Sequence, residues 1–161
     1  MQVKIVNFSQ THVAALEHRG HIGHINATVR VFQDWRQQTG LSPVQSSRSF
    51  GIPYGNPDTT PSDAFRFDIC GEVKALVPPN PQGVRDLVIP AGRCAVVRHT
   101  GSTDCIGETI YPLFRDWLPG SGEEIRDFPL FFSYLSVFPE TPRDAWQTDI
   151  YVPLTSRPQG K

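Results

Sequence analysis

The chain has 161 residues, of which 39% are hydrophobic and 19% charged, and its 15 basic and 16 acidic residues give a formal net charge of -1. Ten Phe and three Trp supply enough large apolar side chains for a packed core, which excludes a mainly disordered chain. The near-zero net charge creates no basic field to attract phosphate backbones or anionic lipid, so direct binding to nucleic acid is not expected.

The N-terminus lacks the apolar stretch of a secretory signal, and no segment approaches the ~18 apolar residues that a membrane span needs. We therefore expect a cytoplasmic protein with no membrane partner. The length suits one compact domain built from two small modules. The three cysteines, Cys70, Cys94 and Cys105, show neither CxxC spacing nor a disulfide pattern, so we expect free and mostly buried thiols.

An internal repeat organises the chain. Residues 60–69 (TPSDAFRFDI) and 141–150 (TPRDAWQTDI) share six of ten positions, 81 residues apart. The same spacing pairs His18 with His99, and residues 32–35 (FQDW) match 114–117 (FRDW) one residue further on. The repeat predicts two copies of one module, at about 1–77 and 84–155, related by a pseudo-twofold axis. The proline-rich segment 78–83 is the predicted joint.

In chain order, each copy is expected to begin with a pair of short strands, 3–8 with 13–16 and then 86–89 with 93–98. A helix follows in each copy, because apolar residues recur every three or four positions. These residues are Ile22, Ile25, Val29, Phe32 and Trp35 in the first copy, and Ile106, Ile110, Leu113, Phe114 and Trp117 in the second. Pro112 within the second series predicts a kink or a late start.

Two further strands are expected to close each copy, 48–54 with 65–73 and 129–138 with 146–154. The last strand alternates most clearly, with Ile150 and Val152 on one face and Asp149 and Tyr151 on the other. One face of each sheet would pack on a helix while the other presents polar and aromatic groups. The predicted fold class is α+β, with two strand-helix-strand-strand modules, antiparallel sheets and a central groove.

The groove is the expected binding site, because the uncovered faces of the two sheets would meet there. Alternation assigns to its lining Arg66, Asp68 and Cys70 from the first copy, and Phe132, Tyr134, Asp149 and Tyr151 from the second, assuming that the strand near 131 faces the same way as the last strand. Aromatic walls with carboxylates suit a flat, apolar, often cationic compound. Alternatively, the aspartates begin strands or bind a neighbouring arginine such as Arg66.

The histidines raise the question of a metal site. His18, His21 and His24 are spaced by three, but Gly20 and Gly23 interrupt any common face and a third ligand is not assured, so no metal is expected. The equivalent positions of His18 and His99 instead indicate a shared structural role at a strand end. No GxSxG, CxxC, Walker or GxGxxG pattern is present, and no cofactor is expected.

Five segments carry a resemblance to a known family. They are His18–Gly20, His99–Gly101, Tyr54–Pro61, Pro129–Leu135 and Asp149–Leu154. Together they resemble the GyrI-like family of gyrase-inhibitory proteins and effector-binding domains of transcription activators. The resemblance implies two strand-helix-strand-strand modules around a central groove. The candidate ligand-binding residues are then Tyr54, Asp68, Phe132, Tyr134, Trp146, Asp149 and Tyr151.

One departure from the family pattern bears on function. The family usually has an acidic residue before Tyr-Leu, where this chain has Phe132, so a carboxylate that would bind cations or act in catalysis is absent. We therefore predict a stand-alone binding protein that captures hydrophobic or cationic small molecules, or one that modulates DNA gyrase. The alternative is a hydrolase of cyclopropane-bearing toxins, with Asp149, Tyr151 or Trp146 in acid–base or stacking roles.

Two other functions were also considered. A purely structural partner module would have its groove filled by its own side chains. A self-contained transcription factor is not expected, because the first module begins within a few residues of Met1 and leaves no room for a helix-turn-helix before it.

Overall fold

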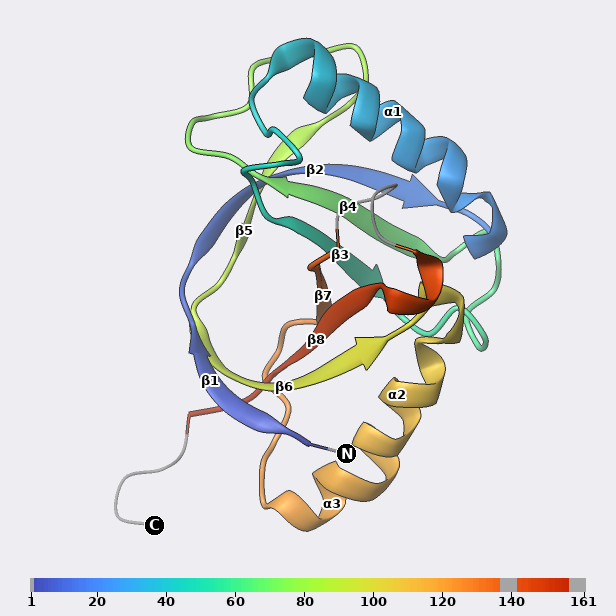
Figure 1. Ribbon diagram of the computed structural model, residues 1–161, viewed down its shortest axis with the longest axis vertical. Coiled ribbons are helices and arrows are strands. Elements are labelled where there is room, and N and C mark those ends of the chain that lie inside the picture. The colour runs from blue at the N-terminus through green and yellow to red at the C-terminus, as the bar shows by residue number, and fades with distance from the viewer. Residues whose placement is uncertain (1, 137–141, 157–161) are drawn as a thin grey trace. The chain divides into compact units, whose positions relative to one another are not determined.

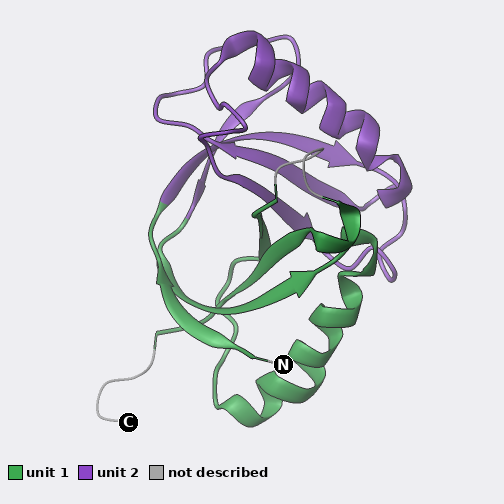
Figure 2. Cartoon of the chain, viewed as in Figure 1, with its two compact units in different colours: residues 1–10, 90–161 green, residues 11–89 purple. Residues whose placement is uncertain are grey.

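The computed structural model describes residues 2–136 and 142–156, and its contacts divide the chain into two compact units (Figure 2). Unit 1 comprises residues 1–10 and 90–161, and unit 2 comprises residues 11–89. Each unit combines antiparallel strands with helices, as the α+β prediction requires. No helix within the described ranges is long and apolar enough to cross a membrane.

Unit 2 contains four antiparallel strands and one long helix (Figure 1). The strands follow the order β3-β4-β2-β5, and their bounds are β2 (Thr11–Arg19), β3 (Ser49–Tyr54), β4 (Arg66–Glu72) and β5 (Arg85–Ile89). A 3-10 turn, η1 (Ile22–His24), leads into α1 (Ile25–Thr39). The helix ends at Gly40, whose φ of 66° lies in the left-handed region that favours glycine.

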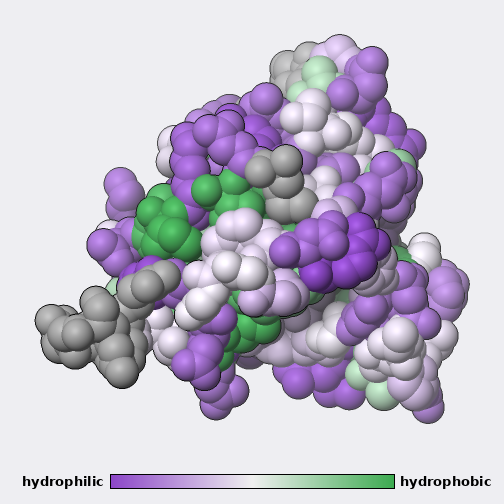
Figure 3. Space-filling view, turned by 90° about the horizontal axis from the view of Figure 1, so that it is seen from below, coloured by the Kyte–Doolittle hydropathy of each residue, from purple (hydrophilic) through white to green (hydrophobic). Residues whose placement is uncertain are grey.

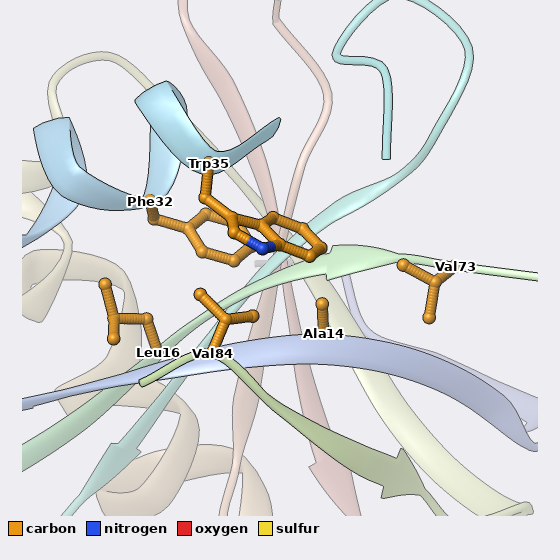
Figure 4. Close-up of a cluster of buried hydrophobic side chains, with 6 residues drawn as sticks. All are labelled: Ala14, Leu16, Phe32, Trp35, Val73 and Val84. Atoms are coloured by element: carbon orange, nitrogen blue, oxygen red, sulfur yellow. The ribbon is translucent and has the colours of Figure 1, made fainter. Parts of the chain in front are cut away.

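Helix α1 packs on the sheet of unit 2 through its apolar side (Figure 4). Phe32 and Trp35 are each only 1% exposed, and their stacked rings lie 5.7 Å apart. They pack against Ala14 and Leu16 of β2 and against Val84, just before β5. Burying an aromatic side chain of this size stabilises the fold by about 1.5–3 kcal/mol. The helix predicted from the apolar spacing is therefore confirmed.

Unit 1 also contains four antiparallel strands, in the order β1-β6-β8-β7 (Figure 1). Their bounds are β1 (Lys4–Phe8), β6 (Gly92–Thr100), β7 (Phe131–Tyr134) and β8 (Gln147–Pro153). The helical elements are the 3-10 turns η2 (Thr103–Cys105) and η4 (Arg143–Ala145), the helices α2 (Gly107–Pro112) and α3 (Leu118–Ser121), and the π turn η3 (Leu113–Trp117). Positions 137 and 138 of the predicted strand 129–138 lie outside the described residues.

The helical segment of unit 1 changes type at Pro112, where a kink or a late start is predicted. α2 ends at Pro112, and the π turn that follows is closed by a hydrogen bond from Leu118 N–H to Leu113 C=O. Proline has no N–H to donate to the preceding turn, which favours such a change of hydrogen-bonding pattern. Leu113 is 2% exposed and fills the core position, whereas Trp117 is half-buried.

The first strands pair differently from the predicted local hairpins. β1 pairs with β6, with Lys4 opposite Val96 and Phe8 opposite Gly92, and β5 pairs with β2. The predicted pairing of 3–8 with 13–16 and of 86–89 with 93–98 is therefore wrong. Alternation locates a strand but says nothing of its partner. The connections at 9–10 and 90–91 carry the chain from one unit into the other.

Strand β1 belongs to unit 1 and strand β5 to unit 2, so the two halves of the chain exchange their first strands. The units therefore differ in extent from the predicted modules at about 1–77 and 84–155. The segment 78–83, predicted as the joint, lies wholly within unit 2. There the side-chain amide of Asn80 accepts from Val84 N–H at 2.9 Å and donates to Val84 C=O at 2.8 Å. This segment is therefore a structured turn that leads into β5.

A histidine near the end of β2 and another near the end of β6 tie these strands to the helix that follows each of them. In unit 2, His18 Nδ1 lies 2.7 Å from Thr28 Oγ1 and Nε2 lies 3.0 Å from His21 C=O. In unit 1, His99 Nδ1 lies 2.7 Å from Thr109 Oγ1 and Nε2 lies 2.9 Å from Ser102 C=O. Because a carbonyl only accepts, Nε2 carries the proton in both rings. The predicted shared structural role is confirmed.

We expect His18→Ala and His99→Ala to lower the free energy of unfolding by similar amounts, about 1–3 kcal/mol each, because each change leaves a hydroxyl and a carbonyl without their partner. Urea unfolding followed by circular dichroism measures both losses. His24→Ala is the control, since His24 is exposed. A clear loss in only one of the two variants, or an equal loss in the control, would contradict the expectation.

Candidate functional site

Each sheet has one face packed against the helix of its own unit and an opposite face, called here the helix-free face. In unit 2, α1 contacts Ala14 and Leu16, so the alternate residues of β2 and their cross-strand neighbours form the helix-free face. In unit 1, His99 bonds to Thr109 of α2, which assigns Arg98 and its neighbours to the helix-free face. The helix thus packs on one face of the strands in each unit, and in unit 2 the helix-free face also carries buried apolar residues such as Val13 and Ile52.

In unit 2 the helix-free face carries a buried carboxylate. Asp68 is 0% exposed, and its Oδ2 accepts hydrogen bonds from the Tyr54 hydroxyl at 2.6 Å and from Arg85 Nη2 at 2.7 Å. Its other oxygen, Oδ1, is buried and has no hydrogen-bond partner among the described residues. Burial and the hydrogen bond to Asp68 raise the pKa of Tyr54, so this hydroxyl stays protonated and acts as a donor.

Two further charged groups complete this cluster. The guanidinium of Arg66 lies 4.6 Å from the centre of the Tyr54 ring and pairs with Glu17, whose pKa that ion pair lowers. Asp68 itself pairs with Arg85. The alternative that this aspartate binds a neighbouring arginine is therefore confirmed, although the partner is Arg85 and not Arg66. Cys70 next to Asp68 is 1% exposed, and burial raises the pKa of its thiol well above the usual value.

In unit 1 the helix-free face carries an aromatic cluster. Lys4, Val96, Tyr151 and Phe131 are successive cross-strand neighbours, so they form one row across the four strands. The rings of Tyr151 and Phe131 stack at 5.0 Å with an interplanar angle of 4°. Phe8 meets both rings edge-on, at 5.4 Å and 5.0 Å. These contacts hold the Tyr151 ring in one orientation, and Tyr151 is the partly exposed ring of the cluster, since Phe131 and Phe8 are buried.

The neighbouring row contains an ion pair. Arg98 donates from Nε and Nη2 to the two oxygens of Asp149, at 2.9 Å and 3.2 Å. The Asp149 side chain is 14% exposed, while that of Arg98 is 53% exposed. The hydrogen bond to Asp149 raises the pKa of Arg98. The charge that this pair presents outward is thus the guanidinium, and the carboxylate lies beneath it.

A cavity of about 720 Å³ adjoins this face, a volume in the range of small-molecule sites. Residues of β1, β6, α2 and β8, with Gln2 before β1, line it. They are Gln2, Lys4, Val6, Val96, Val97, Arg98, Thr100, Glu108, Thr109, Asp149 and Tyr151. Two of the predicted ligand-binding residues, Asp149 and Tyr151, are thereby brought together. Tyr54 and Asp68 form the separate cluster in unit 2.

Two predicted site residues lie on the other face. Phe132 is opposite Ile150 and Tyr134 is opposite Thr148, and these partners alternate with Asp149 and Tyr151. The assumption that β7 faces the same way as β8 is therefore wrong by one residue, because Phe131 and Ser133 share the face of Tyr151 and Asp149. Phe132 is 6% exposed and forms part of the core.

Trp146, the remaining predicted residue, is half-buried just before β8. The guanidinium of Arg143 lies 5.8 Å from its ring centre. Trp146 is not among the residues that line the cavity. Sequence reasoning missed Lys4, Arg98 and Phe131 on the helix-free face of unit 1 and Arg85 in unit 2. The alternation Cys94, Val96, Arg98 could have indicated Arg98. Lys4 and Arg85 could not be predicted in this way, because the pairing of their strands β1 and β5 was predicted wrongly.

Comparison with known proteins assigns the family. Residues 1–155 match the family model described as GyrI-like small molecule binding domain, and the chain belongs to this family. "Probable transcriptional regulator YgiV" of Escherichia coli (strain K12) is 42% identical over 154 residues, which cover 96% of each protein. "DNA gyrase inhibitor" of Erwinia billingiae (strain Eb661) is 28% identical over 108 residues, covering 65% of this chain and 68% of that protein.

Solved structures share the fold. The crystal structure of the EcmrR C-terminal domain matches with a TM-score of 0.76 and 15% identity over 97% of this chain and 98% of that one. EcmrR in a complex with DNA matches with a TM-score of 0.78 and 16% identity over 95% of this chain. The present chain spans 57% of that longer chain. At these identities the likeness concerns the fold alone.

Proposed function

We propose that this protein captures flat, hydrophobic small molecules without converting them. The observation that carries the proposal is the fixed ring of Tyr151, held by Phe131 and Phe8, in the wall of a cavity of about 720 Å³. A rigid aromatic surface next to such a volume suits stacking with an aromatic ligand. Membership of a small-molecule-binding family supports the same function.

Thermal-shift screening tests the proposal. A panel of neutral polycyclic compounds and aromatic cations is mixed with the protein, and ligands that bind the folded state raise the melting temperature according to their concentration and affinity. Concentration-dependent stabilisation by aromatic members of the panel supports capture. If no compound in the panel shifts the melting temperature, the proposed function is wrong.

Tyr151→Ala should weaken the binding of an aromatic hit by roughly 1 to 3 kcal/mol, the typical loss for a large apolar contact. Tyr151→Phe should retain binding, because it keeps the ring that stacks on Phe131. Tyr111→Ala is the control, since Tyr111 is 45% exposed and does not line the cavity. Isothermal titration measures the three affinities, and unchanged affinity in Tyr151→Ala would remove this ring from the site.

The capture of cations, which the sequence also predicts, has less support. Both candidate carboxylates already pair with arginine, Asp149 with Arg98 and Asp68 with Arg85. The same pairing weighs against the hydrolase alternative, because a general base needs a carboxylate able to accept the substrate proton. Product formation from a cyclopropane substrate, abolished by Asp149→Asn, would restore that alternative.

A gyrase-modulating role rests on the name of the Erwinia billingiae relative. Inhibition of gyrase supercoiling by the purified protein would test it. Figure 3 shows hydrophobic residues on one face of the molecule in a few separate patches among hydrophilic ones. Among the described residues of unit 1, the exposed large apolar ones are Ile5, Tyr111, Ile125 and Leu135. Apolar residues scattered over a surface in this way are ordinary and do not by themselves indicate a protein partner.

We also propose that the two units arose from duplication of one module. Strands β1 and β5, β2 and β6, and β4 and β8 begin 81 residues apart, at 4 and 85, 11 and 92, and 66 and 147. The matched contacts of His18 and His99 support the same origin. The copies have diverged in their helices, because Trp35 is buried whereas Trp117 is half-buried in a π turn. The pseudo-twofold axis and the central groove stay predictions.

A further inference from the structure

The charges around the unit 1 cavity carry an inference about the ligand itself. We infer that the cavity prefers an aromatic anion, a flat ring with a carboxylate or similar group, over the matching cation. The inference rests on the proposed function and adds the charge of the ligand to it. It follows from three observations on the helix-free face of unit 1: the paired carboxylate of Asp149, the exposed donors of Arg98 that Asp149 does not use, and the position of Lys4.

The acid in this wall is not available to a cationic ligand. Both oxygens of Asp149 accept from Arg98, and the side chain is 14% exposed. A cation would therefore have to displace the guanidinium and leave it without its partner. Breaking such a two-point charge pair costs more free energy than one exposed contact between the ligand and Asp149 would provide.

The basic groups are the ones that still have donors to offer. Arg98 uses Nε and Nη2 for Asp149, so both hydrogens of Nη1 remain, and its side chain is 53% exposed. Lys4 is exposed and makes no ion pair within the described part of the chain. An incoming carboxylate would thus meet two cations without breaking any existing contact.

The geometry places these cations next to the ring that would hold the ligand. Lys4, Val96 and Tyr151 are cross-strand neighbours on three adjacent strands. With strands about 4.8 Å apart, Lys4 lies about 10 Å along the row from Tyr151. Arg98 lies two residues beyond Val96 on β6. A bicyclic ring seated on Val96 and Tyr151 would bring a carboxylate on its edge within reach of the flexible lysine side chain.

One other acid borders the cavity. Glu108 is exposed on α2, the helix that bonds through Thr109 to the opposite face of the sheet. Its charge therefore acts from outside the row of Lys4, Val96 and Tyr151. The four charged groups of the lining sum to zero, but those on the helix-free face that remain open to a ligand are Lys4 and Arg98.

Three naphthalene derivatives of similar size test the inference: 2-naphthoate, 2-naphthylmethanol and 2-naphthylmethylammonium. Isothermal titration at physiological salt should show naphthoate binding about 3–10-fold tighter than the alcohol, the range for one exposed and one hydrogen-bonded charge contact. The ammonium compound should bind weakest. Raising the salt concentration should narrow the difference, since both cations are exposed to water.

Lys4→Gln should reduce the preference for naphthoate over the alcohol by about 2–5-fold. Lys74→Gln removes the same charge from an exposed site in unit 2 and serves as the matched control. If the ammonium compound or the alcohol binds as tightly as naphthoate, this inference is overturned while capture of aromatic compounds stands. If none of the three binds, both proposals are overturned.

Discussion

Trp35→Ala should lower the free energy of unfolding by about 3–5 kcal/mol, the range for removing a large, fully buried aromatic side chain. Trp35 is 1% exposed and stacks on Phe32 over Ala14 and Leu16, so the truncation opens a cavity that rigid neighbours cannot fill. Urea unfolding, followed by far-ultraviolet circular dichroism, measures the loss.

Trp117→Ala is the matched control, because the two tryptophans occupy corresponding positions in the repeat. Trp117 is half-buried, and the buried position in its segment is taken by Leu113, so its loss should be less than half as large. Trp35→Phe should be far milder than Trp35→Ala. The indole Nε1 is buried without a hydrogen-bond partner among the described residues, so phenylalanine sacrifices volume but no hydrogen bond. Equal losses at Trp35 and Trp117 would show that the burial difference has no energetic consequence.

Asp68→Ala should cost about 2–4 kcal/mol, because it removes the acceptor of two hydrogen bonds, one of them from a cation. The Tyr54 hydroxyl loses its acceptor and Arg85 loses its counter-charge. The Arg85 side chain is 42% exposed, so water solvates part of the released charge and the loss stays below that of a wholly buried pair. Chemical denaturation at neutral pH measures it.

The exposed Asp63, in the same unit, provides the control, and Asp63→Ala should change stability by no more than about 0.5 kcal/mol. A double-mutant cycle of Tyr54→Phe with Asp68→Ala isolates the hydrogen bond between the two side chains, and we expect a coupling of about 1 kcal/mol or more. Additive effects in that cycle would mean that this contact does not stabilise the fold.

Sequence reasoning located the elements well, because each depends on local periodicity. The apolar spacing from Ile22 to Trp35 identified α1, and the alternation from Thr148 to Val152 identified β8 and its two faces. The pairing of β1 with β6 and of β5 with β2 depends on the path of the chain after each strand. No local sequence pattern predicts that path. The type of turn after Pro112 also depends on tertiary packing.

The candidate site was predicted in part for the same reason. Asp149 and Tyr151 were assigned correctly to one face because β8 alternates cleanly. Phe132 and Tyr134 were misplaced because a shift of one residue in register moves every side chain to the other face of the sheet. Lys4 could not be predicted, because it reaches the site through a strand that pairs far along the sequence.

The exchange of first strands also determines the order in which the two units can fold during translation. Unit 2 is one continuous stretch, residues 11–89, whereas unit 1 combines residues 1–10 with residues 90–161. Strand β1 must therefore stay unpaired until its partner β6, residues 92–100, has been made, and such distant pairings form slowly. A nascent chain that has emerged through residue 89 should thus contain all four strands of unit 2 while β1 is still a free strand.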